Sequence, residues 1–97
     1  MKLVWSFIAA GNLIENNRYI ARDNPDAARD LIKNIYEAGN RIKEYPEKGR
    51  VVPEFRKNNT REVFCRGYRI IYKIEGKRIT ILTVRHMRQH IVKETIK

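Results

Sequence analysis

Arginines in the last third of the chain are the side chains best suited to bind an anion. They are Arg61, Arg66, Arg69, Arg85 and Arg88. A guanidinium forms two parallel hydrogen bonds to a phosphate or a carboxylate, so this set favours an anionic partner. Tyr68 and Tyr72 lie close to Arg69 in the sequence, and aromatic rings beside arginines can stack on bases. Strand alternation turns both tyrosines to the same side as Ile70, which favours packing in a core instead.

The charge of the chain points to the same kind of partner. The 97 residues carry a net charge of +10, and most of it lies in the second half. Residues 1–48 hold 8 Lys and Arg against 7 Asp and Glu, whereas residues 49–97 hold 13 against 4. Such one-sided positive charge predicts a polyanionic partner, which is either a nucleic acid or an acidic protein.

Length and composition narrow the class of protein. Ninety-seven residues predict one domain over 1–97, large enough to bury a core without metal or disulfides. Cys65 is the only cysteine, so we expect a reducing, cytoplasmic compartment and a small buried hydrophobe rather than a nucleophile. No apolar run approaches the ~18 residues of a membrane span. The apolar stretch 1–10 is short and interrupted, so we expect no signal peptide.

Three β-rich runs must position the arginines. They cover residues 61–67, 68–76 and 78–86. Val, Ile, Tyr, Thr and Phe are frequent in them, and glycines separate them. Glu75-Gly76-Lys77 is short enough to close a hairpin, so we expect three antiparallel strands. We expect Trp5 and Phe64 in the core beside one face, and Arg69 on the opposite face, open to a partner.

The first half of the chain predicts one strand and two helices. Lys2–Trp5 is a short apolar run, and Ser6 can cap the helix that follows it. An apolar stripe recurs along that helix at three- and four-residue spacing. It comprises Ala10, Leu13, Ile14, Asn17, Ile20 and Ala21. Asn24-Pro25 then ends the first helix and caps a second, which we expect to run to about Glu44.

These elements predict an α+β fold. The N-terminal strand and the helical hairpin would pack on a mainly antiparallel sheet. The opposite face of the sheet, which would carry the arginines and which we call the arginine face, would stay uncovered. Residues 46–55 are expected to form a loop or a short irregular strand, and residues 56–60 a polar loop. Residues 87–97 are expected to form a C-terminal helix or a flexible tail.

With the elements in this order, the chain resembles the RelE/ParE superfamily of toxins from type II toxin–antitoxin systems. The segments that carry the resemblance are Lys2–Ser6, Tyr19–Ala28, Pro46–Arg50, Pro53-Glu54, Arg61-Glu62, Tyr68–Tyr72 and Leu82–His86. The long helical hairpin with its Asp-Asn-Pro turn is more similar to the ParE branch than to the RelE branch. The resemblance implies a toxin that a cognate antitoxin holds inactive.

The two branches imply different activities. ParE-like members poison DNA gyrase, and RelE-like members cut mRNA on the ribosome without a metal. The nuclease alternative would use Glu54 as base, Arg69 to bind phosphate and His86 as acid. The terminal His-Tyr pair of those enzymes is missing, and His86 lies one residue early, which turns it to the opposite strand face. Glu54 could instead be a solvated carboxylate or the partner of an arginine, and Arg69 could pair with Glu62 across the sheet.

We therefore expect a ParE-like toxin that poisons DNA gyrase by binding, with the arginine face meeting gyrase or the antitoxin. The alternatives are a ribosome-dependent mRNA endoribonuclease and a degenerate member that only binds its antitoxin. The antitoxin is expected to be acidic where it meets the arginines. We expect no cofactor and no metal, because the spacing of His86, His90 and Glu94 alone is poor support for a metal site.

Overall fold

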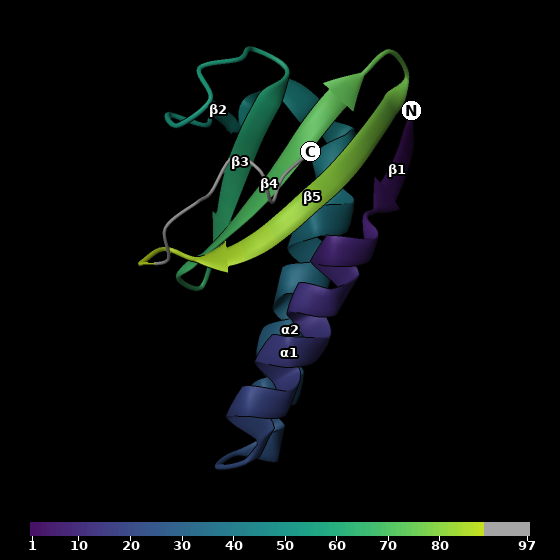
Figure 1. Ribbon diagram of the computed structural model, residues 1–97. Helices are drawn as coiled ribbons and strands as arrows, with labels where there is room; N and C mark the ends of the chain where they lie inside the picture. Colours follow the sequence, from purple (N-terminus) through teal and green to yellow (C-terminus); the bar gives the residue numbers. More distant parts are fainter. Residues whose placement is uncertain (89–97) are drawn as a thin grey trace.

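The computed structural model describes residues 1–88 and shows two helices packed on a five-stranded sheet (Figure 1). The helices are α1, Phe7–Ala21, and α2, Pro25–Asn40, followed by the 3₁₀ turns η1, Arg41–Glu44, and η2, Pro46–Lys48. The strands are β1, Lys2–Trp5, β2, Arg50–Val51, β3, Thr60–Cys65, β4, Tyr68–Glu75, and β5, Arg78–His86. The predicted α+β class is confirmed. Apart from Met87 and Arg88, the predicted C-terminal helix or tail lies outside the described residues.

The order of the strands across the sheet is β1-β5-β4-β3-β2. The two hairpins between β3, β4 and β5 are antiparallel, as predicted, and Gly76 takes a positive φ of 56° in the turn before β5. The sequence did not indicate where β1 would pair. It lies parallel to β5 at one edge, so the sheet is mixed.

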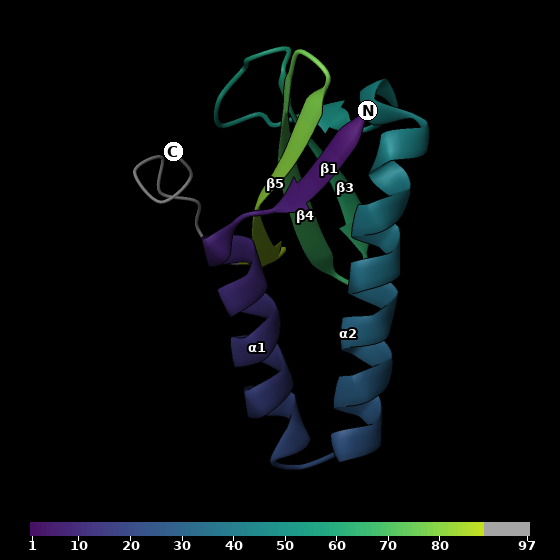
Figure 2. The ribbon, with the colours of Figure 1, turned by 90° about the vertical axis from the view of Figure 1, so that its right-hand side faces the viewer.

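Side-chain caps begin both helices at the residues that the sequence indicates. Ser6 Oγ accepts a hydrogen bond from the Ala9 N–H, and Asn24 Oδ1 accepts one from the Ala27 N–H, each at 3.0 Å. The second helix ends at Asn40, earlier than predicted, because the backbone tightens there into η1. Figure 2 shows that the hairpin projects well beyond the sheet.

The main core lies between the hairpin and one face of the sheet. Its buried side chains are Ala9, Ile35, Ile42, Ile70, Tyr72, Ile79, Ile81 and Val84. The prediction for α1 was partly wrong, because Ala9 is buried in place of Ala10, while Ile14 and Asn17 are exposed. The side of α1 that carries Asn12 meets β5, because Asn12 Oδ1 accepts hydrogen bonds from the Val84 N–H and Thr83 Oγ1.

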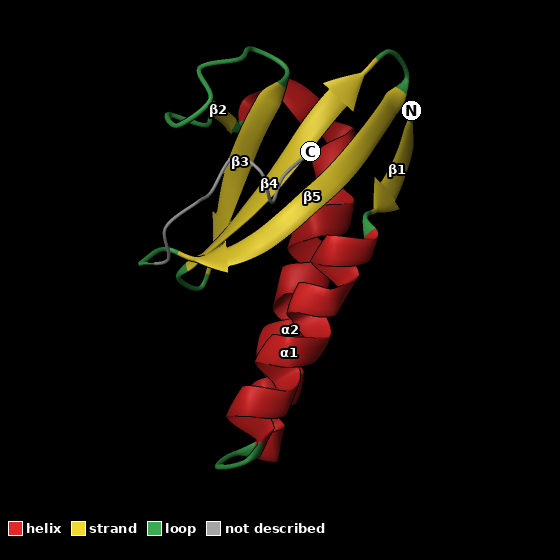
Figure 3. Cartoon of the chain, in the orientation of Figure 1, coloured by secondary structure: helices red, strands yellow, loops and turns green. Residues whose placement is uncertain are grey.

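The opposite face, which we call the outer face, is partly covered. Val52 and Ile71 are buried in a second small cluster, against which Phe55 and Leu82 pack. Val52 and Phe55 belong to the loop between β2 and β3, which Figure 3 shows in green beside the strands. The prediction that this face is uncovered was therefore wrong at its centre, because apolar residues of the loop bury Ile71.

Candidate functional site

The strand register sorts the predicted site residues between the two faces. Phe64, Arg69 and Arg85 are directly opposite one another on β3, β4 and β5. Directly opposed residues share a face, and Arg69 alternates with the core residue Ile70, so all three belong to the outer face. Arg50 is opposite Glu62 and continues this face onto β2.

Arg69 is the centre of an ion-pair network on the outer face. Its Nη1 and Nη2 atoms each donate a 2.9 Å hydrogen bond to the Glu54 carboxylate, in a bidentate fork. Its Nε donates to Glu62 Oε1 at 2.5 Å. The side chain is 8% exposed, although it carries a full charge. The two alternatives that the sequence left open, an arginine partner for Glu54 and a pair between Arg69 and Glu62, are both confirmed.

Glu62 joins a second arginine to this network. Its Oε2 accepts a 2.6 Å hydrogen bond from Arg50 Nε, and its side chain is 0% exposed. Two guanidinium groups and two carboxylates thus neutralise one another. A buried carboxylate is tolerated here because both of its oxygens accept charge-assisted hydrogen bonds.

The pairing shifts the pKa of both groups in the fork. The hydrogen bonds from Arg69 hold the pKa of Glu54 below its ordinary value, and burial opposes this only in part. The hydrogen bonds to Glu54, and then to Glu62, raise the pKa of Arg69 above its ordinary value. A carboxylate with a lowered pKa is a weaker proton acceptor, so the fork weakens Glu54 as a general base.

Arg61 lies apart from the other predicted arginines. It is opposite Tyr72, whose partner on β5 is Ile81, so it belongs to the helix-facing side of β3. Its Nη1 donates to the carbonyls of Glu47 and Gly49 at 3.0 and 2.8 Å. The expectation that Arg61 joins one arginine face is corrected, because strand alternation points it to the other side.

Arg66, Arg85 and Arg88 gather at one end of the β3–β5 region. Arg66 lies in the turn after β3 with a positive φ of 49°, and Arg88 follows β5. The Met87 N–H donates to the Gly67 carbonyl at 2.9 Å, which joins the two segments. Among the residues of 1–88, no carboxylate lies within ion-pairing distance of these three arginines.

His86 is on the other side of the sheet from the Arg69 network. It is opposite Tyr68, and the two rings meet edge to face with centroids 5.3 Å apart. Its Nδ1 accepts a 3.2 Å hydrogen bond from the Arg88 N–H. The structure therefore brings Glu54 and Arg69 together, but it places His86 on the opposite face. The one-residue offset of His86 in the sequence indicated this position, because such an offset turns a strand side chain to the other face.

Phe64 is a residue that the sequence reasoning misplaced. We expected it in the core, but 44% of it is exposed on the outer face. The Arg50 guanidinium carbon lies 5.1 Å from the centre of its ring, which is cation–π distance. Val63 and Cys65, its neighbours in β3, pack on the main core, so the alternation of β3 could have placed Phe64 outside.

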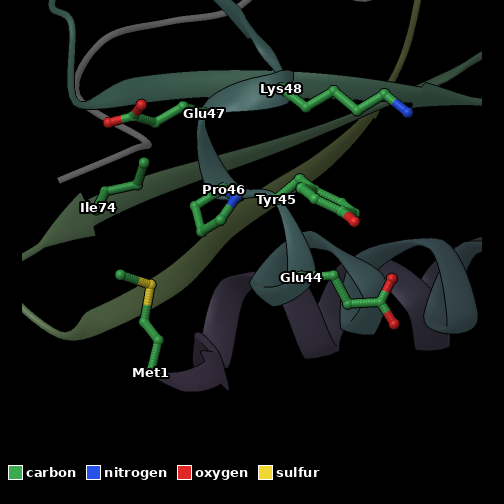
Figure 4. Close-up of a pocket in the computed structure, with 7 residues that line it drawn as sticks. All are labelled: Met1, Glu44, Tyr45, Pro46, Glu47, Lys48 and Ile74. Carbon is green, nitrogen blue, oxygen red and sulfur yellow. The ribbon is translucent and has the colours of Figure 1, made fainter.

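Other features of the described part of the chain carry none of the predicted site residues. The hollow in Figure 4 is lined by Met1, Glu44, Tyr45, Pro46, Glu47, Lys48 and Ile74. Within residues 1–88, no three His, Cys, Asp or Glu side chains gather as metal ligands would; His90 and Glu94 lie outside this range. The helices within residues 1–88 lack the combination of length and apolar content that a membrane span requires.

Comparison with known proteins gives consistent matches. The sequence profile of the family described as "ParE toxin of type II toxin-antitoxin system, parDE" matches residues 3–91. A Sinorhizobium fredii protein named "Putative toxin Y4kP" is 36% identical over 90 residues, which cover 91% of this chain and 90% of that protein.

Two solved structures share the fold. The first is from the chromosomal ParDE toxin–antitoxin system of P. aeruginosa, with a TM-score of 0.76, 20% identity and coverage of 89% of this chain and 95% of that one. The second is from the RelBE2 toxin–antitoxin complex of Mycobacterium tuberculosis, with a TM-score of 0.52, 16% identity and coverage of 88% and 95%.

Proposed function

The chain belongs to the ParE toxin family of type II toxin–antitoxin systems, and from this premise we propose that it acts in the cytoplasm by binding and poisoning DNA gyrase. Its cognate antitoxin would hold it inactive. Growth arrest would follow from the complex between the toxin and gyrase, and it would need no chemistry by the toxin itself.

The observation that carries this proposal is the fork between Glu54 and Arg69. The groups that a nuclease would need as base and phosphate binder are bound to each other at 2.9 Å. The fork lowers the pKa of Glu54, and Arg69 is almost fully buried, so neither group is ready for catalysis. His86, the predicted acid, lies on the opposite face. This arrangement favours a binding inhibitor.

The experiment compares two assays on the same purified toxin. We expect it to inhibit supercoiling by gyrase or to accumulate cleaved DNA, and to leave ribosome-bound mRNA intact. Glu54→Ala is expected to keep the effect on gyrase. Glu75→Ala is the matched control, because it removes an exposed strand-end carboxylate that pairs only with Lys73 among the described cations. A toxin that leaves gyrase unaffected contradicts the proposal.

The runner-up is a ribosome-dependent mRNA endoribonuclease. One observation favours it: a carboxylate and a guanidinium lie side by side on one face, as base and phosphate binder would. The ribosome would then have to separate Glu54 from Arg69. Under this alternative the toxin cuts ribosome-bound mRNA, and Glu54→Ala abolishes cleavage while Glu75→Ala does not.

The antitoxin is expected to lay a segment over the helices and the sheet, and the groove between the two helices would hold part of that segment. Exposed apolar side chains, Ile14 and Tyr36, line this groove beside Lys33 and beside Arg29, which is paired with Asp26 at 3.0 Å. An apolar, acidic segment would match both features. Because unlike charges steer association, we expect the association rate to fall as salt is raised, and a rate that is independent of salt would argue against an acidic partner.

A further inference from the structure

An exposed aromatic ring lies among arginines on the outer face of the sheet. Phe64 has Arg50 against its ring, Arg69 and Arg85 in its own cross-strand row, and Arg66 two residues further along the chain. We call Arg50, Phe64, Arg66 and Arg85 the Phe64 patch. Adjacent strands are about 4.8 Å apart, and Arg85 lies two strands from Phe64. Their Cα atoms are therefore roughly 10 Å apart across the sheet.

The patch keeps a positive charge after its internal pairing. Glu62 and Glu54 neutralise Arg50 and Arg69. Arg66 and Arg85 have no carboxylate within ion-pairing distance among the described residues, so they make the patch cationic. The patch therefore combines a neutralised ion-pair network with two cations at its edge, Arg66 and Arg85, beside an aromatic ring that is open to solvent.

Arg50 is held in place before any partner arrives. Its Nε is bound to Glu62, which is itself fully buried, and its guanidinium rests on the Phe64 ring. Even so, 57% of the Arg50 side chain is exposed. A planar, immobilised guanidinium loses little conformational entropy when a partner stacks on it.

We propose that the Phe64 patch binds single-stranded nucleic acid, with a base stacked on the Phe64–Arg50 pair and backbone phosphates held by Arg66 and Arg85. Spaced cations alone would also attract an acidic peptide. The exposed ring favours nucleic acid, because the aromatic face of an unpaired base stacks on an aromatic ring or a guanidinium. A peptide carboxylate would bind the guanidinium through its oxygens, and the negative face of the ring would repel it. The inference does not depend on gyrase, since it concerns direct binding by the toxin.

Fluorescence anisotropy with the purified chain tests the proposal. Labelled oligothymidylate, oligouridylate, a DNA duplex and oligoglutamate are titrated over a range of salt concentrations. We expect both single strands to bind more tightly than the duplex or oligoglutamate. A preference between the first two would identify DNA or RNA as the natural source of the same chemistry.

Variants separate stacking from charge. Phe64→Leu is expected to weaken single-strand binding about tenfold with an unchanged salt slope, whereas Phe64→Tyr keeps the affinity. Arg85→Gln is expected to reduce the slope of log affinity against log salt by about 0.7. Arg18→Gln is the matched control, because it removes an exposed arginine from α1, and it should leave the slope unchanged.

Three results would overturn the proposal. They are tighter binding of oligoglutamate than of the single strands, wild-type affinity in a folded Phe64→Leu variant, and equal loss of slope in Arg85→Gln and Arg18→Gln. Circular dichroism establishes folding for each variant. The anisotropy assay contains neither gyrase nor ribosomes, so its result is independent of the result of the gyrase assay.

Discussion

Replacing Glu62 by glutamine is expected to destabilise the protein far more than the same change at Glu54, although both carboxylates bind Arg69. The Glu62 side chain is 0% exposed and accepts hydrogen bonds from two arginines. A glutamine there can offer its oxygen to only one of them and turns its NH₂ group toward the other. Loss of one partner of a buried ion pair costs about 3–5 kcal/mol.

The same change at Glu54 meets a different environment. Its side chain is 37% exposed, so water can solvate the outer N–H groups of Arg69 once the carboxylate is gone. Solvent screening limits the cost to about 1 kcal/mol or less. For a domain of this length, the total stability is roughly 5–15 kcal/mol. Glu62→Gln should therefore lower the melting temperature by about 12 °C or more, and Glu54→Gln by only a few degrees.

Urea unfolding followed by Trp5 fluorescence provides the measurement, since Trp5 is the only tryptophan and packs on the core. The control is the double variant Glu62→Leu with Arg69→Met, which removes both buried charges and should recover much of the loss. Equal costs for Glu62→Gln and Glu54→Gln would refute the reasoning. So would a double variant less stable than Glu62→Gln.

Three further predictions concern pH, packing and capping. Because the pKa of Glu54 is lowered in the folded protein, this residue contributes stability that is fully present above its ordinary pKa of 4.5 and is lost as pH falls through the folded pKa. In thermal melts at falling pH, the Glu54→Gln variant should therefore lose less stability than the wild-type protein. Gly39→Ala should cost about 1–3 kcal/mol in urea unfolding, because its Cβ would lie 2.5 Å from Trp5 Cζ2, whereas Gly11→Ala, with nothing within 4 Å, should gain about 0.5–1 kcal/mol. Asn24→Ala should cost about 1 kcal/mol by the same assay, since it removes the cap of α2.

Local signals predicted the elements of this fold well. The caps at Ser6 and Asn24 and the hairpin at Gly76 each depend on residues within a few positions of one another. The alternation of Tyr68–Glu75 also placed Ile70 and Tyr72 in the core correctly. Such features are readable because the physical cause lies inside the segment that shows it.

Pairing between distant segments could not be read in the same way. The parallel pairing of β1 with β5 joins residues far apart in the sequence, and no local pattern specifies it. The partner of Arg69 on the loop, Glu54, depends on how the loop folds over Ile71. Phe64 was misplaced because an apolar residue in a strand fits either face until the register is known.

The fork between Glu54 and Arg69 bears on function as well as on stability. For Glu54 to accept a proton from a 2′-hydroxyl, it must first leave Arg69, because the hydrogen bonds from Arg69 are what lower the pKa of its carboxylate. For Arg69 to bind a phosphate, the loop that carries Glu54 must move away from a side chain that is 8% exposed. Both steps oppose the pairing that lowers the pKa of Glu54. A binding inhibitor needs neither step, because the exposed cations Arg66 and Arg88 are already available to a partner on the folded toxin.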